Sequence, residues 1–393
     1  MSQTPLPSTF AAPGAASRSE RPYVYICCPW TPVGGGMYKI ADYLIQAQGS
    51  DPEGLHAQLQ PLDTRGSGSA AGSLWVLARA MGRLVRGRLE GRLVGAHVNM
   101  AERLSLVRKS TVITLCRMLG VPVVLHLHAA QLHHAYRRFP KPLQWAVRWI
   151  FSLPRTVIVL GHASADFVSR ELGVPASRVE IVINGVPDPV VPRRVPDGTR
   201  RVLFVGNLME RKGVSDLLRA LADPRLSDLP LEATFAGGGD VEGYRAMAER
   251  MGLADRVRFT GWASQDQVAQ LLSQADAFVL PSYDEGLPLA ILEALAAGVA
   301  VVCTPVGEIP HVLTDGQDAC FVQPGDAPAI AAALDRILHD DDFREQLESR
   351  GRALHRGRFS LAQFYAGITA IHRRHFGVGG APAAPQRNQE TRA

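Results

Sequence analysis

The sequence is poor in cysteine and lysine and contains no long apolar run. Its five cysteines form no Cys-x-x-Cys pair, which argues against a zinc or disulfide framework and favours reduced thiols in a cytoplasmic protein. No apolar run reaches the ~18 residues that a membrane-spanning helix needs. Residues 1–21 are rich in Ser, Ala and Pro and lack the basic and apolar regions of a secretory signal.

The composition is that of a folded protein with more than one domain. Hydrophobic residues make up 46% and charged residues 20% of the 393 residues, so the chain can bury sizeable cores and is not disordered throughout. At about 100–200 residues per domain, this length predicts two domains.

Charge is distributed unevenly along the chain. Residues 1–195 contain 22 Lys and Arg against 11 Asp and Glu, whereas residues 196–393 contain 20 against 26. The basic first half predicts an anionic partner such as a nucleic acid, a membrane surface or a phosphorylated lipid. Few aromatic residues are interleaved for base stacking, so nucleic acid is the least favoured of the three.

Many of these basic residues lie in and after the segment Trp75–Leu89. They alternate with apolar residues at near-helical spacing, which is typical of an amphipathic helix on an anionic membrane surface. A solvated helix face explains the same pattern, and both interpretations stay open. The basic residues of this region are Arg79, Arg83, Arg86, Arg88, Arg92, Arg103, Arg108 and Lys109.

Short apolar runs alternate with helical patterns along nearly the whole chain, which predicts βαβ units around parallel sheets. We expect two Rossmann-like, doubly wound α/β domains over 22–186 and 199–359, facing a central cleft and joined by a Pro-rich linker over 187–198. A helix over 360–376 can cross back to the first domain, and disordered tails are expected over 1–21 and 377–393. The expected strands are Tyr23–Cys28, His56–Gln60, Leu93–Val98, Val121–Leu127, Thr156–Leu160, Val179–Ile183, Arg201–Gly206, Leu231–Ala236, Val257–Gly261, Ala277–Leu280, Val299–Cys303 and Ala319–Val322.

The stretch Pro281–Gly298 combines a turn with the start of a helix. The helix is expected to begin near Leu287, with Pro288 in its first turn. Amide groups at such a helix start form an anion site that suits a diphosphate. Glu285 precedes the helix and Glu293 lies inside it, so both carboxylates can accept hydrogen bonds from the hydroxyls of one elongated ligand. The alternative is a capping Glu285 and a solvent-facing Glu293.

A second stretch, Phe204–Gly213, joins a strand to a glycine turn and the basic pair Arg211 and Lys212. The chain has 38 arginines but only four lysines, and Lys212 is the only lysine after Lys141. A retained ammonium is consistent with a phosphate partner that needs a point charge. A single lysine also arises by chance.

The two stretches resemble the nucleotide-binding half of family 4 retaining glycosyltransferases, which have the GT-B fold. The pattern Gly-x-Leu…Lys-Gly, followed by Pro-Ser…Glu-Gly-x-x-Leu…Glu-Ala…Ala-Gly, covers roughly residues 200–326. The stretches Phe259–Trp262 and Thr304–Gly307 add to this resemblance. The first half of the chain matches more loosely, at Gly34–Gly36, His126–His128 and Asn184–Val186.

The resemblance implies a nucleotide-sugar domain over 199–359. Glu293 would bind the ribose hydroxyls of a nucleotide sugar, Glu285 the hydroxyls of the donor hexose, and Lys212 the diphosphate. The residues whose backbone would contact the phosphate and the sugar are Gly286, Leu287, Pro288 and Leu289, and of these Pro288 has no N–H to donate.

The resemblance also implies that residues 22–186 form the acceptor-binding domain. Gly35 and Gly36 would approach the diphosphate from this domain, where a side chain would clash. His128 would point into the cleft near the reacting sugar.

The sequence departs from the family pattern at two positions. The family often has Arg directly after the first glycine of the lysine motif, where this chain has Asn207. Phosphate charge would then be neutralised by Lys212 with help from Arg211, or the donor would bind more weakly. At His311 many relatives carry an acid, and we assign this histidine no role.

Four histidines, at positions 126, 128, 133 and 134, raise metal binding as an alternative. No nearby Cys or carboxylate completes a ligand set for them, so we expect no catalytic metal and no other cofactor.

The resemblance implies a retaining hexosyltransferase, and with the lack of a metal-ligand set it leads us to expect a metal-independent one. It would move a hexose from a nucleotide diphosphate sugar to an acceptor hydroxyl, with a lipid-linked glycan of surface polysaccharide biosynthesis as the acceptor. The protein would be cytoplasmic, or peripheral at the inner face of the cell membrane. The alternatives are a related sugar-nucleotide epimerase or phosphorylase, and a non-catalytic GT-B protein on membranes, against which Glu285, Glu293 and Lys212 argue.

Overall fold

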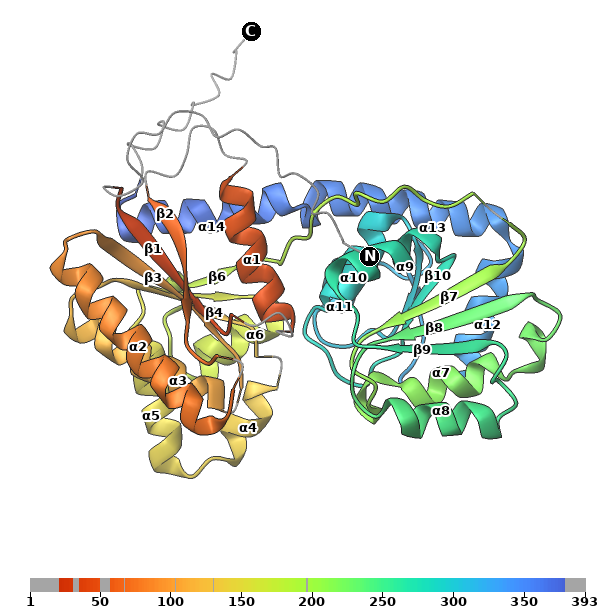
Figure 1. Ribbon diagram of the computed structural model, residues 1–393, viewed down its shortest axis with the longest axis horizontal. Coiled ribbons are helices and arrows are strands. Elements are labelled where there is room, and N and C mark those ends of the chain that lie inside the picture. Colours follow the sequence, from red (N-terminus) through yellow and green to blue (C-terminus); the bar gives the residue numbers. More distant parts are fainter. Residues whose placement is uncertain are drawn as a thin grey trace, which may run out of the picture.

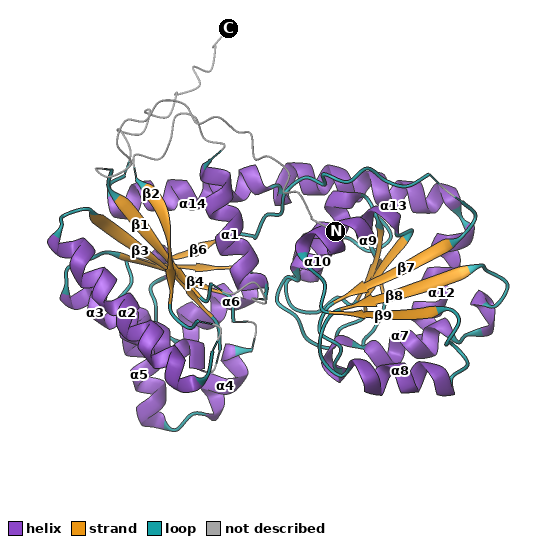
Figure 2. Cartoon of the chain, in the orientation of Figure 1, coloured by secondary structure: helices purple, strands orange, loops and turns teal. Residues whose placement is uncertain are grey.

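The computed structural model describes residues 21–30, 35–49, 57–66, 68–102, 104–129, 131–195 and 197–378. They form two α/β domains that lie side by side, each built on a six-stranded parallel sheet with helices packed around it (Figure 1 and Figure 2). The strand orders are β2-β1-β3-β4-β5-β6 in the first sheet and β12-β11-β10-β7-β8-β9 in the second. The two-domain, doubly wound architecture expected from the sequence is therefore confirmed.

The first domain contains strands β1 to β6 and helices α1 to α6. The strands are β1 Tyr23–Cys28, β2 Gln58–Asp63, β3 Leu93–Met100, β4 Val123–Leu127, β5 Thr156–Val159 and β6 Val179–Ile181. The helices are α1 Gly36–Gln48, α2 Ala70–Leu89, α3 Leu104–Met118, α4 Leu132–Arg138, α5 Lys141–Ser152 and α6 His162–Asp166.

The second domain contains strands β7 to β12 and helices α7 to α13, and α14 follows it. The strands are β7 Arg200–Val205, β8 Leu231–Ala236, β9 Val257–Gly261, β10 Ala277–Leu280, β11 Ala300–Cys303 and β12 Cys320–Phe321. The helices are α7 Val214–Leu221, α8 Val241–Arg250, α9 Gln265–Gln274, α10 Leu289–Ala297, α11 Ile309–Val312, α12 Ala327–His339, α13 Asp341–Leu354 and α14 Leu361–Phe376.

Every strand expected from the sequence has a counterpart, and the ends differ by three residues or fewer. The largest difference is at β2, which ends at Asp63 instead of Gln60. It begins at Gln58, and His56 lies outside the described residues. Gly34, Arg103 and Pro196 also lie outside them, as do residues 1–20 and 379–393 of the expected tails.

The start of α10 corrects one expectation. The helix begins at Leu289, and Pro288 is its N-cap residue with an extended backbone (φ −69°, ψ 128°). The reason is local, because a proline disfavours helical geometry in the residue before it and so keeps Leu287 out of the helix. Glu293 therefore lies about one turn from the helix start.

The central strands β1, β3, β4 and β5 of the first sheet are buried on both faces, apart from one half-buried residue of β3, as parallel strands are in doubly wound folds. In β1, Val24, Ile26 and Cys28 belong to the core shared with α14 and the second domain. The alternate side chains Tyr23 and Tyr25 belong to a separate core on the opposite face of the sheet.

Two chain segments connect the domains. The linker is tied to the second domain by Arg194, whose guanidinium lies 2.8 Å from Asp276 Oδ2. Where the two segments pass each other, Val186 N donates to Phe359 O (2.9 Å) and Leu361 N donates to Val186 O (3.0 Å). Helix α14 then packs against the first domain, in contact with α1 and β4.

Helix α2 covers the segment Trp75–Leu89. Its side chains Ala80 and Leu84 are buried against the first domain, whereas Leu74, Trp75 and Leu89 are exposed together with the arginines. Apolar side chains thus occupy both faces of α2, which differs from the simple division into a basic and an apolar face.

Candidate active site

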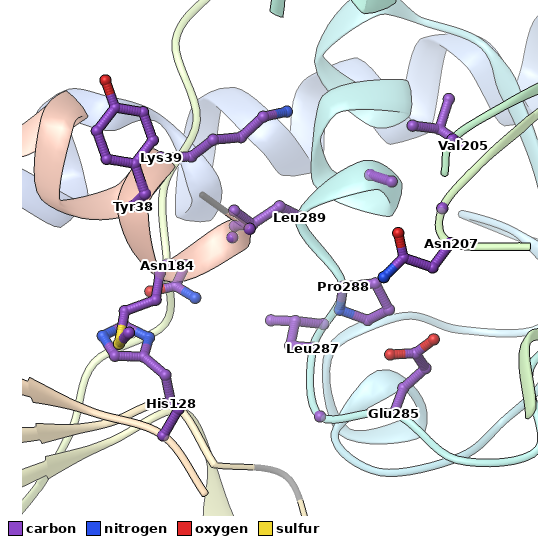
Figure 3. A pocket seen from close by; sticks show the side chains of 18 of the residues that line it. Tyr38, Lys39, His128, Asn184, Val205, Asn207, Glu285, Leu287, Pro288 and Leu289 are labelled. Carbon is purple, nitrogen blue, oxygen red and sulfur yellow. The ribbon is translucent and has the colours of Figure 1, made fainter. Parts of the chain in front are cut away.

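A cavity of about 650 Å³ lies between the two domains (Figure 3). The ends of parallel strands and the loops that follow them form its walls, as expected for doubly wound sheets that face each other. Every residue that the sequence assigned to the site lines this one cavity. These residues are Gly35, Gly36, His128, Asn207, Arg211, Lys212, Glu285, Gly286, Leu287, Pro288, Leu289 and Glu293.

Glu285 is the centre of a polar cluster in the second domain. Its Oε1 accepts hydrogen bonds from Lys212 Nζ and from Ser282 Oγ (2.8 Å). Arg211 lies 3.9 Å from the other carboxylate oxygen and donates to the carbonyl of Asp284. The carboxylate of Glu285 is thus fixed on the cavity wall next to two cations, and the alternative of a capping role is not what the contacts show.

Gly213 brings the loop of Lys212 against the loop of Glu285. It ends the short 3₁₀ turn Glu210–Lys212 with a left-handed backbone (φ 69°), which favours glycine. A Cβ at this position would lie 2.1 Å from the carbonyl oxygen of Pro281. The glycine after the lysine therefore has a structural reason, because it permits the approach that pairs Lys212 with Glu285.

Glu293 lies on α10 and is bonded from the other domain. Lys39 Nζ of α1 lies 2.8 Å from Glu293 Oε1, and the Tyr43 hydroxyl lies 3.5 Å from the same oxygen. Oε2 of Glu293 is buried and has no hydrogen-bond partner among the described residues. Burial, together with the Glu293 carboxylate, raises the pKa of Tyr43 above its usual value. Glu293 does not face solvent, and one of its oxygens is left free to accept hydrogen bonds from a ligand.

The starts of α1 and α10 face each other across the cavity. A Cβ on Gly36, the first residue of α1, would lie 3.3 Å from Leu289 Cδ1. A Cβ on Gly35 would meet no atom of the described structure within 4 Å. A side chain at Gly36 would thus press on Leu289, whereas the space at Gly35 is open, and the clash with a diphosphate stays a prediction.

His128 directly follows β4, and its partly buried side chain lines the cavity. Its Nε2 lies 2.8 Å from Asn99 Oδ1. Because an amide oxygen only accepts, this bond places the ring proton on Nε2 and leaves Nδ1 as an acceptor. Burial lowers the pKa of His128 to about 3, so the ring is neutral near pH 7 and acts through hydrogen bonds rather than through charge.

Behind His128, three fully buried histidines form a chain of hydrogen bonds. His97 Nδ1 lies 2.8 Å from His372 Nε2, and His97 Nε2 lies 3.2 Å from His126 Nδ1. The ring centroids of His126 and His128 are 4.0 Å apart. Among the described residues, no group of three or more His, Cys, Asp or Glu side chains is arranged to hold a metal ion.

Sequence reasoning missed the residues by which the domains touch across the cavity. Besides Lys39, these include Gln131, whose amide donates to Asp284 Oδ2 (2.7 Å), and Glu308, whose carboxylate accepts from the backbone N–H groups of His162 (3.0 Å) and Ala163 (2.9 Å). The scarcity of lysine was a usable signal for Lys39, since the argument applied to Lys212 applies equally to it.

The fold and the cavity define a two-domain α/β protein with its site between the domains. Two family models match the chain, "Glycosyl transferases group 1" over residues 191–354 and "Glycosyltransferase Family 4" over residues 100–188. The chain therefore belongs to the group 1 glycosyltransferases of family 4 type, which have the GT-B fold.

Known proteins agree with this assignment. The chain is 26% identical over 276 residues to an alpha-D-kanosaminyltransferase from Streptomyces kanamyceticus, covering 65% of this chain and 72% of that protein. It is 35% identical over 159 residues to the lipopolysaccharide core biosynthesis glycosyltransferase LpsE of Rhizobium meliloti, covering 40% of this chain and 45% of that protein. The crystal structure of Anabaena Alr3699/HepE in complex with UDP and glucose has the same fold (TM-score 0.68, 18% identity, 90% of this chain and 99% of that chain).

No helix in the described part of the chain is both long and apolar enough to cross a membrane. All five cysteines are described, and none forms a disulfide.

Proposed function

We propose that this protein transfers a hexose from a nucleoside diphosphate sugar to an acceptor hydroxyl with retention of the anomeric configuration. The observation that carries the proposal is that one cavity holds two ion pairs, Lys212 with Glu285 and Lys39 with Glu293. A nucleotide sugar has the complementary pattern, because two groups of hydroxyls flank its anionic diphosphate. Carboxylates accept from the hydroxyls, and ammonium groups bind the phosphates.

Each part of the donor has a partner in this proposal. The ribose hydroxyls donate to Glu293, whose Oε2 has no other partner among the described residues. The hexose hydroxyls donate to Glu285. The diphosphate lies at the start of α10, where amide groups and the helix dipole favour an anion, and next to Lys212 and Arg211. Asn207 lines the cavity beside them and adds no charge.

The proposed reaction needs no side-chain nucleophile and no metal ion. The bond between the anomeric carbon and the diphosphate oxygen breaks, and the acceptor oxygen attacks from the same face. The proton of the acceptor hydroxyl moves to the departing phosphate oxygen. Charge develops on the leaving diphosphate, so fixed donors aimed at it lower the barrier. Closure of the two domains excludes water from the sugar cation. The neutral His128 accepts a hydrogen bond from a sugar hydroxyl through Nδ1.

Turnover of defined donors tests this function. Purified protein is incubated with UDP-, GDP- and ADP-hexoses and a glycolipid extract, and released nucleoside diphosphate is measured. Lys212→Met should lower turnover about 100-fold, as loss of one oxyanion-stabilising donor does in other enzymes, while the protein stays folded because Arg211 remains beside Glu285. Lys141→Met, the same change on the exposed start of α5, is the matched control.

Several results would contradict the proposal. Wild-type protein that releases nucleoside diphosphate from no donor would exclude the transferase and leave an epimerase, a phosphorylase or a non-catalytic protein. Near-normal turnover of Lys212→Met would assign the phosphate to Arg211. A product of inverted anomeric configuration by NMR would exclude retention, and loss of turnover with EDTA would exclude a metal-free reaction.

We further propose that the acceptor is a lipid-linked glycan and that the first domain docks on an anionic membrane surface. Helices α2 to α5 contain no Asp or Glu, and α2, α3 and α5 lie along one side of this domain (Figure 1). Trp75 and Trp145 on these helices are 65% and 69% exposed. Exposed tryptophans among basic residues are typical of an interfacial surface.

Sedimentation with vesicles tests the docking. Each basic residue near an anionic surface contributes about 1 kcal/mol, so Arg83, Arg86 and Arg88 changed together to Ser should abolish sedimentation with anionic vesicles. The matched control changes three exposed arginines of the second domain, Arg245, Arg250 and Arg258, to Ser. Salt should weaken wild-type binding, because the Debye length is about 8 Å at physiological ionic strength. Wild-type protein that stays in the supernatant at low salt would show α2 to be a solvated face.

A further inference from the structure

Lys39 belongs to the first domain, and its side chain contacts the second domain. It lies in the first turns of α1, and its Nζ is 2.8 Å from Glu293 Oε1 on α10. The side chains are 22% and 11% exposed, and both residues line the cavity. Figure 3 shows the Lys39 side chain extended from α1 toward α10. The contact is therefore a partly buried ion pair across the cleft.

The proposed function requires this pair to change when donor binds. A ribose diol occupies both oxygens of a carboxylate, whereas Glu293 offers a free Oε2 and an Oε1 that already accepts from Lys39. Ribose hydroxyls replace the hydrogen bond that Lys39 makes but carry no charge. A partly buried ammonium that loses its carboxylate needs another anion nearby, because an unpaired buried charge is costly.

The donor itself brings that anion. Lys212 is paired with Glu285 in the same way as Lys39 is paired with Glu293. In both pairs the carboxylate is assigned to sugar hydroxyls, so donor binding frees both lysines at once. The diphosphate between ribose and hexose carries the negative charge that both lysines then lack.

The position of Lys39 places it near the diphosphate. Helix α1 begins at Gly36, and a Cβ there would lie 3.3 Å from Leu289, the first residue of α10. The diphosphate is assigned to this same start of α10. Lys39 follows Gly36 by three residues, so it lies near the start of α1, and its flexible four-carbon stem allows its ammonium to turn from Glu293 toward the helix start.

We propose that Lys39 is a diphosphate-binding residue, which leaves Glu293 for the donor diphosphate when the ribose hydroxyls occupy that carboxylate. This inference rests on the proposed function and adds to it a cation from the first domain. Donor binding would then hold the two domains together through Lys39 on one side and Lys212 on the other.

The test compares a nucleoside diphosphate with the nucleoside that lacks the phosphates. UDP, ADP and GDP are titrated into wild-type protein by calorimetry, and the one that binds is compared with uridine, adenosine or guanosine. Lys39→Met should weaken diphosphate binding by about tenfold or more. The same variant should bind the nucleoside as well as wild type or more tightly, because the competitor for Glu293 is gone.

Matched controls separate this result from damage to the fold. Lys141→Met makes the same change on the surface of the first domain and should leave both affinities unchanged. Lys39→Arg keeps the positive charge and should retain most of the diphosphate affinity. Thermal unfolding of Lys39→Met shows whether the domain remains intact.

Two results would overturn the inference. Tighter binding of both the diphosphate and the nucleoside by Lys39→Met would show that Lys39 only competes for Glu293. Unchanged binding of both would show that it has no part in donor binding. If wild-type protein binds none of the three nucleoside diphosphates, the proposed function fails first and this inference fails with it.

Discussion

Two of the four lysines in the chain lie in the cavity, and each holds one of the two carboxylates assigned to the donor. At the scale of single residues, the free protein keeps its cations and anions neutralised by one another. When a donor binds, its hydroxyl groups would replace the lysines at the carboxylates, and its phosphate groups would replace the carboxylates at the lysines. Binding of the neutral nucleoside and of the charged diphosphate should therefore respond to different substitutions.

Replacement of Glu293 tests the carboxylate side of this exchange. Glu293→Ala should weaken donor binding by about 1.5–3 kcal/mol, because two ribose hydroxyls lose a charged acceptor. Titration calorimetry with the donor measures the loss. Glu249→Ala, at an exposed position on α8, should leave donor affinity unchanged. Equal affinities of Glu293→Ala and wild type would remove this carboxylate from the site.

At the scale of elements, α14 contributes one histidine to a buried chain that reaches toward the cavity. His372 of α14 contacts His97 of β3, which contacts His126 of β4. Burial lowers the pKa of His97 to about 3 and holds the pKa of His126 and His372 well below the ordinary value. The docking of α14 on the first domain therefore depends on imidazoles that stay neutral.

The three buried histidines predict a steep loss of stability in acid. A histidine with a lowered pKa binds fewer protons in the folded than in the unfolded protein between pH 6.5 and about pH 3. The free energy of unfolding then falls as pH drops through this range, by up to about 1.4 kcal/mol per pH unit for each such residue. The free energy of unfolding is measured with denaturant between pH 7 and pH 4. Per pH unit, it should fall less in His372→Gln than in wild type, by up to about 1.4 kcal/mol.

An exposed histidine supplies the control for the acid experiment. His134→Gln alters a side chain on the surface of α4. Its free energy of unfolding should depend on pH as in wild type. If the free energy of unfolding of His372→Gln also depends on pH as in wild type, the buried histidines do not cause the loss of stability in acid.

At the scale of the whole molecule, the two domains are held together by polar contacts across the cavity. Glu308 of the second domain accepts from the amides of His162 and Ala163 at the start of α6, and it is almost fully buried there. Gly161 leaves the space for this carboxylate, because a Cβ on Gly161 would lie 2.1 Å from Glu308 Cδ.

Gly161→Ala should therefore disturb the closed arrangement of the domains. The added methyl group displaces the Glu308 carboxylate from two charge-assisted hydrogen bonds, each worth about 1.5–3 kcal/mol. Small-angle X-ray scattering should show a larger radius of gyration for Gly161→Ala than for wild type. The double variant with Glu308→Ala removes the colliding atoms and is the control for steric conflict. A scattering curve identical to wild type would show that Glu308 does not hold the domains together.

Much of the fold and of the second-domain site could be predicted from the sequence, because the signals are local. A strand buried on both faces of a parallel sheet is a short apolar run whatever it packs against. The residues Asn207 to Gly213 and Glu285 to Leu289 each lie between a strand and a helix, so their spacing along the chain is enough to predict that they lie at one edge of the sheet. The start of α10 was misplaced because Pro288 is the N-cap residue and does not lie inside the first turn.

The rest was decided by the packing of the two domains. Lys39 lies 254 positions before the carboxylate that it pairs with, and Gln131 lies 153 positions before Asp284. Neither partner can be read from periodicity or local spacing, since both depend on how the linker and α14 bring the sheets together. The sequence by itself determined the strands, the helices and the loops of the second domain. Only the tertiary structure decided which side chains of the first domain reach that half, because contacts between separate domains are fixed by their relative placement and not by the pattern within either one.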